Sequence, residues 1–385
     1  MDGGGAWALI QVRALQEMFG EQAEGHAVLG TFDIGIANSG GTLVLGGLIE
    51  NRRLDEIAEM FRDGGKRRRI FESTGLSGRL NNRIGLGPRY SAAAKQRAIE
   101  AFYDRAGGKL LPQAVADLSN YAGRVPHVVF VAYDYDRNRA TFFRSSPMTH
   151  AGHGGLPKEG VTLAQAIHAS TNAPVNYFDE PAFFAAPFPR YWDGGVTGNN
   201  NPALAGLTEA VGLGAQPHDV RILSIGTATQ ILPLRQENER PSPLLQEPGQ
   251  PGLVADIKKL AKSILGDPPD AATFIAHMLS GGTEGLPPGV PSRVVRMNPM
   301  VRPIGGPGAW RPPDGIDLAQ FRALCEMDVD AVGDEEVALI DRLARVWLNG
   351  APINQPIRYN SATFAPELGH ASFPAAKQAW LAMTT

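Results

Sequence analysis

The stretch TFDIGIANSGGTLVLGGL, residues 31–48, decides the fold. Its first part is a short apolar run with β-branched residues, which favours a buried strand. After Ala37-Asn38-Ser39-Gly40-Gly41 the chain continues with small and apolar residues, which favour a buried helix. A serine in a strand-to-helix turn of tiny residues is typical of a nucleophile elbow. The usual spelling is G-x-S-x-G, with Ala37 here in place of the first glycine, and the alternative is a glycine-rich loop around an ordinary serine.

Composition describes a folded globular chain. Its 385 residues exceed the ~250–300 at which single cores usually stop growing. This length fits one large α/β domain with an elaborated C-terminal part, or two domains. Apolar residues make up 43% and charged residues 19% of the chain, as in ordinary globular proteins. The net charge of −3 gives no reason to expect a nucleic acid partner.

The cysteine content and the apolar patterning limit the cellular compartments in which the protein is expected. The single cysteine, Cys325, excludes an internal disulfide framework and a multi-cysteine metal site, and fits a reducing compartment. It lies in a helical-looking stretch, so we interpret it as a buried thiol rather than a nucleophile. No apolar run reaches the ~18 residues needed to span a bilayer, and no signal peptide pattern opens the chain. We therefore expect a cytoplasmic protein that reaches any lipid by peripheral contact at a membrane surface.

Strand and helix patterns alternate in the first 230 residues. Buried strands are predicted at 127–133 and 220–226, and residues 141–144 pair with the first of these as a hairpin. Residues 172–178 are expected to be extended. Helices are predicted at 51–62, 91–106, 163–170 and 203–211. This alternation predicts an α/β fold around a largely parallel sheet.

The composition shifts near residue 234, where proline and glycine begin to punctuate the chain. Helical patterns continue between them, at 253–265, 271–279, 318–325 and 335–349. We expect a catalytic domain over residues 1–235. The rest, residues 236–385, is predicted to be a helical and loop-rich C-terminal extension packed on the same domain, with a lid over the site as one hypothesis for its role.

A basic segment follows the first helices. Lys66-Arg67-Arg68-Arg69 is succeeded by Arg79, Arg83 and Arg89 in a Gly/Asn-rich and irregular-looking stretch. A loop of this kind could contact anionic lipid headgroups, each cation near the surface contributing ~1 kcal/mol. The alternative is a solvated loop balanced by nearby acidic residues.

Three glycines, Gly3, Gly4 and Gly5, lead directly into a helical pattern. The free N–H groups and the dipole of a helix N-terminus favour negative charge, so this loop can hold a phosphate or an oxyanion. No Gly-Lys-Ser/Thr follows, so it is not a Walker loop, and nucleotide binding is the weakest alternative.

A candidate base lies much later in the chain. Asp193 stands in an Asp-Gly-Gly turn, followed by Asn-Asn-Pro at 200–202. Together, DGGG at 2–5, the serine at 39 and this later DGG resemble the patatin-like phospholipase family. HVVFVAYDYDRNRATFFR, AIHASTNAPVNYF and RILSIGTAT add to the similarity in the same order, so that it spans about residues 2–230.

The resemblance implies a patatin-like three-layer α/β sandwich and a serine–aspartate dyad without a histidine. Ser39 would be the nucleophile, Asp193 the base, and the N–H groups of Gly3, Gly4 and Gly5 the oxyanion hole. Burial would make Asp193 a stronger base than an ordinary aspartate, whose pKa is about 3.9. The implied activity is that of a lipid acyl hydrolase of the phospholipase A or lipase type, acting on membrane phospholipid or another acyl lipid without cofactor or metal.

The sequence departs from the family pattern at the glycine loop. The family usually has x-Arg/Lys-Gly after its glycines, whereas this chain has Trp7-Ala8, which suits a less polar ester. A strand normally precedes those glycines, and here only Met1 and Asp2 do. Either the central strand is missing or the natural start lies upstream.

Other chemistries remain as alternatives. His150 and His153 could suggest a metal site, but no nearby carboxylate or cysteine completes it. His127 and His168 lie in apolar stretches and are interpreted as packed, while a Ser39–His–Asp triad stays open because triad partners need not be near in sequence. The rival from another class is a catalytically silent member that binds lipid or regulates a partner. Oligomeric state, lipid headgroup, acyl chain length and any activator are left open.

Overall fold

The central sheet brings together strands that lie far apart in the chain. The structure, a computed structural model, describes residues 1–70, 88–118, 123, 125–146, 160–237, 239–249, 251–252, 270–282, 292–350, 353–360 and 365–384. Strand β1 (Ile34–Asn38) pairs in parallel with β2 (His127–Asp134). Strands β3 (Arg139–Arg144) and β4 (Tyr191–Asp193) both pair antiparallel with β2. The α/β class is confirmed, and this part of the sheet is mixed.

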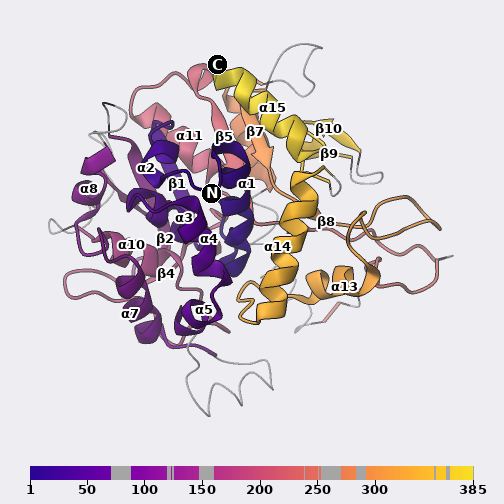
Figure 1. Ribbon diagram of the computed structural model, residues 1–385, viewed down its shortest axis with the longest axis horizontal. Coiled ribbons are helices and arrows are strands. Elements are labelled where there is room, and N and C mark those ends of the chain that lie inside the picture. Colours follow the sequence, from indigo (N-terminus) through magenta and orange to yellow (C-terminus); the bar gives the residue numbers. More distant parts are fainter. Residues whose placement is uncertain are drawn as a thin grey trace.

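The first two residues join this sheet to a second parallel pair, β5 (Ile222–Ile225) with β7 (Val294–Met297). Met1 donates from its amine to the Ile36 carbonyl at 2.9 Å and accepts from the Asn38 N–H at 3.2 Å. The Asp2 N–H donates to the Ile225 carbonyl at 3.0 Å. Met1 and Asp2 therefore occupy the position between β1 and β5 in which a central strand is expected, and the N-terminus lies beside β1 (Figure 1).

Smaller ribbons complete the strands. β6 (Thr229–Gln230) pairs in parallel with β8 (Met300–Val301), and β9 (Arg358–Tyr359) pairs antiparallel with β10 (Pro366–Leu368). Within the described part of residues 1–212 the α-helices are α1 (Leu9–Phe19), α2 (Gly25–Leu29), α3 (Gly40–Ile49), α4 (Leu54–Arg62), α5 (Gly64–Ile70), α7 (Ala92–Phe102), α8 (Leu111–Ala114), α10 (Leu163–Ser170) and α11 (Ala203–Gly212). Short 3₁₀ helices are η1 (Gly5–Ala8), η2 (Ala116–Leu118), η3 (Gly194–Thr197) and η4 (Pro217–Asp219).

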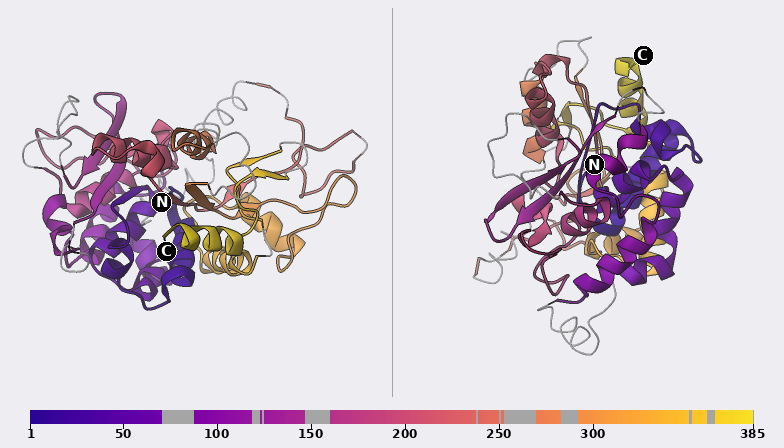
Figure 2. Two further views of the ribbon diagram at one scale, coloured as in Figure 1. Left: turned by 90° about the horizontal axis from the view of Figure 1, so that it is seen from above. Right: turned by 90° about the vertical axis from the view of Figure 1, so that its left-hand side faces the viewer.

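Helices cover both faces of the sheet, as neighbouring residues of β1 show. The Cα of Gly35 faces the Leu29 and Leu45 side chains of α2 and α3, whereas the next residue, Ile36, packs against Gly206 of α11. Because successive strand residues point to opposite faces, α3 and α11 lie on opposite sides of the sheet. The right-hand view of Figure 2 shows helices on each side of the strands, as a three-layer arrangement requires.

The C-terminal part is integrated into the same core. Helices α13 (Leu318–Glu326), α14 (Asp334–Leu348) and α15 (Phe373–Thr384) follow β7, and residues 270–279 are also helical. Figure 1 shows α14 beside α1, and the two helices are in contact. Buried side chains of α13, α14 and α15 belong to the main apolar cluster together with those of α1 and α3. The domain boundary near residue 235 remains a prediction, and the helix expected at 253–265 lies outside the described residues.

Two local expectations are wrong. Residues 66–69 belong to helix α5 rather than to an irregular loop. Arg67 is buried there; it donates to the carbonyls of Phe61 and Arg62 and pairs with Asp334. These acceptors stabilise a helix in the segment where the run of charges had suggested a solvated loop. Residues 174–177 form turns rather than an extended segment. Arg79 and Arg83 lie outside the described residues.

Candidate active site

Ser39 and Asp193 converge because β1 and β4 meet end to end. Both strands use the same edge of β2, since β3 occupies the other edge. β1 pairs with β2 up to Asn38 opposite Val131, and β4 continues along that edge, ending with Asp193 opposite Ala132. The two strands run toward each other, so the residue after β1 and the last residue of β4 leave the sheet at one point.

Ser39 lies in the strained turn between β1 and α3. Its φ of 46° and ψ of −126° form a conformation that a serine adopts only when its surroundings impose it. The Ser39 N–H donates to Ser170 Oγ at 3.1 Å, which ties the turn to the end of α10. A Cβ on Gly40 would lie 2.5 Å from the Gly5 carbonyl oxygen, so only glycine fits directly after the serine. Ala37 is fully buried in the apolar core, which accommodates its methyl group.

Asp193 is a buried carboxylate close to Ser39. Its side chain accepts from the Gly195 N–H at 2.8 Å and from Asn38 Nδ2 at 3.3 Å, and the Ser39 side chain lies near enough to lower its pKa. Burial raises the pKa of Asp193 above its ordinary value, against the opposing effect of these hydrogen bonds and of the Lys95 charge. The result is a carboxylate with more affinity for a proton than an exposed one.

The glycine loop faces the serine turn. The Gly3 N–H donates to the Asn200 carbonyl at 2.9 Å, so in this conformation it is engaged. Within the described chain, the N–H groups of Gly4, Gly5 and Gly40 have no hydrogen-bond acceptor. A Cβ on Gly4 would lie 2.2 Å from Thr227 Oγ1, and that hydroxyl donates to the Gly3 carbonyl at 2.6 Å. The loop is thus held closely, with free donors beside Ser39.

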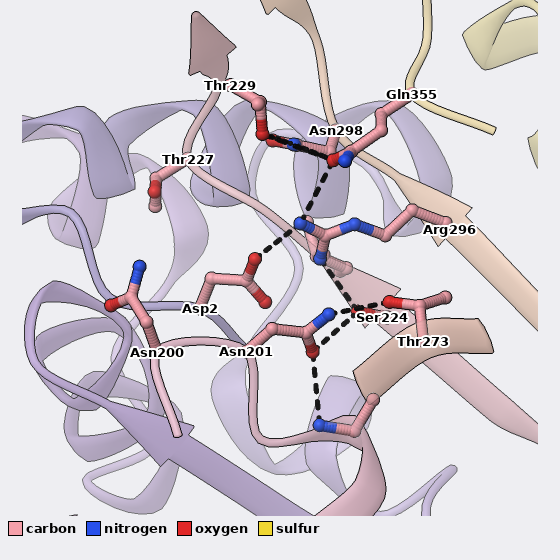
Figure 3. A network of polar contacts seen from close by, with 12 residues as sticks. Asp2, Asn200, Asn201, Ser224, Thr227, Thr229, Thr273, Arg296, Asn298 and Gln355 are labelled. Atoms are coloured by element: carbon pink, nitrogen blue, oxygen red, sulfur yellow. Dashed lines mark hydrogen bonds and ion pairs between the residues drawn. The ribbon is translucent and has the colours of Figure 1, made fainter. Parts of the chain in front are cut away.

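A polar network supports this loop from the C-terminal half of the sheet (Figure 3). Asp2 Oδ2 forms a buried ion pair with Arg296 Nη2 at 2.5 Å, and Arg296 Nη1 donates to Ser224 Oγ at 2.8 Å. Gln355 Oε1 also accepts from Arg296, at 3.4 Å. Asp2 directly precedes the three glycines, so the position of β7 is coupled to the position of the loop.

A cavity of about 580 Å³ opens over these groups. Its floor carries Ser39, Asp193 and the three glycines, and Trp7 and Leu43 add apolar surface. A second wall comes from the C-terminal part of the chain. Residues 324–330 form it, with Leu324, Met327 and Val329 lining the cavity. Short sequence patterns do not predict which residues form this wall, because it depends on a contact between segments about 300 residues apart: the Ala6 N–H donates to the Val329 carbonyl at 3.0 Å.

Residues 327–330, called the strap below, are held by charged and phenolic side chains. Arg89 pairs with Asp328 at 3.0 Å and with Asp330 at 2.9 Å. Tyr90 Oη donates to Asp330 at 2.6 Å and Tyr177 Oη to Asp328 at 2.5 Å. Arg89 of the basic segment is therefore balanced by acidic residues, as one of the two interpretations of that segment requires.

Histidine and metal chemistry find little support in the described residues. No histidine within the described ranges lines the cavity, and these ranges contain no group of three or more His, Cys, Asp or Glu side chains able to hold a metal. His127 and His168 are buried, which confirms their packed interpretation, whereas His150 and His153 lie outside the description. Cys325 is only partly buried, and burial raises the pKa of its thiol to about 11.

No helix in the described parts of the chain is long and apolar enough to cross a membrane.

Comparison with known proteins assigns the family. The sequence profile described as patatin-like phospholipase matches residues 1–207, more than half of the chain. The chain therefore belongs to the patatin-like phospholipase family, a family of lipid acyl hydrolases. No curated protein matches the chain in sequence. Among solved structures, the chain is similar to VipD from Legionella pneumophila, with 11% identity and a TM-score of 0.35 over 89% of this chain and 66% of that one.

Proposed function

We propose that this protein is a carboxylic ester hydrolase that releases fatty acids from acyl lipids, with Ser39 as nucleophile and Asp193 as base. The observation that carries the proposal is the convergence of a serine in a strained strand-to-helix turn and a buried carboxylate at one point of the sheet, inside an apolar cavity. Nucleophilic serine catalysis needs such a paired base, because a serine hydroxyl is a weak nucleophile at its own pKa.

The reaction proceeds in two acyl transfers. Ser39 Oγ attacks the ester carbonyl carbon while its proton passes to the Asp193 carboxylate, and the resulting tetrahedral oxyanion collapses as the alcohol leaves with that proton. Water then attacks the Ser39 ester, again giving its proton to Asp193, and the fatty acid departs as the Ser39 hydroxyl is regenerated. The raised pKa of Asp193 supports its role, because a carboxylate with more affinity for protons is a better base.

For the oxyanion we propose the N–H groups of Gly4, Gly5 and Gly40. All three lack an acceptor in the described chain, and Gly40 directly follows the nucleophile, as the second donor of a nucleophile elbow should. Gly3 supports the loop through its N–H bond to Asn200 and its carbonyl bond from Thr227. Such preorganised donors are typically worth ~10²–10³ in rate for each one removed.

The walls of the cavity favour an apolar acyl chain. Leu43, Leu324 and Met327 line it. Trp7 also lines it, and it stands at the position after the glycines where the family usually has Arg or Lys. We propose that the lipid is reached by surface contact, in the cytoplasm. The second candidate, a silent lipid-binding protein, keeps the cavity as a binding site and is favoured only by the departures from the family pattern around Ala37 and Trp7.

A labelling experiment separates the two. A fluorophosphonate probe should label the wild-type protein at Ser39, and short-chain p-nitrophenyl esters or phospholipid should be cleaved. Ser39→Ala and Asp193→Asn should each abolish cleavage. Ser91→Ala is the matched control: its hydroxyl caps α7 by accepting from the Ala94 N–H, so its loss costs ~1 kcal/mol of stability but no labelling. Full activity in either dyad variant contradicts the dyad, and an unlabelled wild-type Ser39 favours the silent candidate.

A further inference from the structure

Lys95 is a buried cation in the wall of the proposed catalytic cavity. It extends from α7, is 0% exposed, and lines the cavity with Ser39 and Asp193. A fully buried lysine is rare unless it is paired with an acid. Yet within the described chain no carboxylate lies at ion-pair distance from Nζ, and Asp193 is the charged group that acts on it through space.

The surroundings of Lys95 Nζ fit an ammonium. Nζ donates to the His168 carbonyl at 3.1 Å and to Thr171 Oγ1 at 3.2 Å. The Thr171 hydroxyl gives its own proton to the Ile167 carbonyl at 2.8 Å, so toward Nζ it is an acceptor. The Phe178 ring lies 4.1 Å from Nζ and offers its negative face. Three acceptors match the three donors of –NH₃⁺, whereas a neutral amine would direct a lone pair at one of them.

The same short segment also holds the two proposed catalytic residues. Residues 168–172 comprise the last residues of α10 and the two residues that follow it, and the helix dipole favours a cation at this end. Ser170 Oγ accepts from the Ser39 N–H at 3.1 Å, and the Asn172 carbonyl accepts from the Asp193 N–H at 2.9 Å. Lysine, serine and aspartate are therefore fixed to one piece of backbone, so the charge of Lys95 has a constant position relative to Asp193.

Resting on the proposed function, we propose that Lys95 is a positioning residue for ester hydrolysis, whose caged ammonium keeps Asp193 ionised and able to take the Ser39 proton. The burial of Asp193 alone would favour its protonated form, which cannot act as a base. A fixed positive charge in the same water-poor cavity offsets that cost more strongly than it would in water. No covalent step involves the lysine.

The pH dependence follows from the groups that face the pair. Asp193 on β4 and His168 on α10 face Lys95, while Ser39, Asn38 and Lys95 face Asp193. Burial lowers the pKa of both Lys95 and His168, so the imidazole stays neutral in the working range. Activity should fall at low pH as Asp193 is protonated, and the charge of Lys95 should hold this acid limb at a lower pH than burial alone would give.

Lys95→Met, which keeps the apolar stem and removes the charge, tests the proposal. The measurement is the rate of Ser39 labelling by a fluorophosphonate against pH. We expect the acid limb to move up by about one pH unit or more, equivalent to about tenfold slower labelling on that limb. Tyr103→Phe is the control: it removes a buried hydroxyl bonded to the Leu43 carbonyl beside the end of α7, without changing any charge near Asp193, and the acid limb should stay in place.

An unchanged acid limb in a folded Lys95→Met protein, even with uniformly slower labelling, overturns the proposal, because loss of packing alone predicts that result. If Lys95→Met does not fold, Thr171→Val replaces it. That variant removes one acceptor of the ammonium and so disfavours the charged form of Lys95. The acid limb should move up, and an unmoved limb overturns the proposal. A wild-type protein that is not labelled at any pH contradicts the proposed function itself and is recognised before the variants are compared.

Discussion

The two walls of the cavity are built in different ways. The wall that carries Ser39, Asp193 and the glycine loop is fixed by backbone: strand pairing on β2 and the insertion of Met1 and Asp2 between β1 and β5. The strap, residues 327–330, has a backbone bond to Ala6 but is otherwise held by side chains, with Arg89 at its centre. The comparison indicates that the chemistry is placed rigidly, while substrate access depends on side-chain charges that are easier to change.

The largest effect is expected where the two halves meet, at the Asp2–Arg296 pair. Arg296→Met leaves the Asp2 carboxylate buried, and its Oδ1 already has no partner in the described chain. Removing one partner of a buried pair typically costs about 3–5 kcal/mol. Denaturant unfolding should show a loss of that size in the free energy of unfolding, together with loss of esterase activity, because Asp2 precedes the glycine loop.

Arg13→Met is the matched control for this prediction. Arg13 also pairs with a buried acid, Asp341, but that carboxylate keeps Arg62 and Arg345 as partners. Its loss should therefore cost clearly less. The double variant Asp2→Asn/Arg296→Met should recover part of the stability. A loss below about 1 kcal/mol in Arg296→Met would mean that the ion pair does not hold the two halves together.

The second largest effect is expected in the wall that carries Ser39, Asp193 and the glycine loop, which is the rigid wall of the cavity. In Gly40→Ala the new methyl group meets the Gly5 carbonyl and N–H at 2.5 and 2.7 Å, so the glycine loop must move away from Ser39. We expect kcat for ester cleavage to fall by ~10²–10³, the usual cost of a lost oxyanion donor. Gly108→Ala has open space around its Cβ and should leave kcat unchanged. A Gly40→Ala protein with wild-type kcat would show that this turn tolerates displacement.

Much of the rigid wall could be predicted from sequence, and the reason is local. The strand, turn and helix around Ser39, helix α10 at 163–170 and the hairpin of β2 and β3 follow from short apolar patterns and turn residues. The placement of Asp193 depended on family resemblance, because β4 has only three residues and gives no periodic signal. The pairing of β5 with β7 joins segments separated by about 70 residues, a distance at which pattern alone cannot choose a partner.

The sequence around Lys95 contains a signal that could have predicted its burial. It lies three residues after Ala92 and four before Ile99, and all three are buried on one face of α7. A lysine on an apolar helix face predicts either a snorkelling side chain or a buried charge with a function. The strap offers no comparable signal, since Asp328 and Asp330 resemble any solvated acidic turn until Arg89 and Tyr177 are placed beside them.

The smallest effect is expected at the strap, where Arg89→Gln removes both ion pairs. The Arg89–Asp328 pair is partly exposed and contributes about 1 kcal/mol or less. Asp330 is buried but keeps the Tyr90 hydroxyl as a donor, so the free energy of unfolding should fall by less than in Arg296→Met. The strap lines the cavity, however, and Asp328 and Asp330 then repel each other without their shared cation. We expect KM for long-chain esters to rise a few-fold with kcat nearly unchanged.

High salt should move the wild-type KM toward the KM of the Arg89→Gln variant, because salt screens exposed charges. Arg190→Gln, which breaks an exposed pair with Asp136 on the distant hairpin, should leave KM and its salt dependence unaltered. If Arg89→Gln lowers kcat as strongly as Gly40→Ala, the strap belongs to the rigid part of the site and the distinction between the two walls fails.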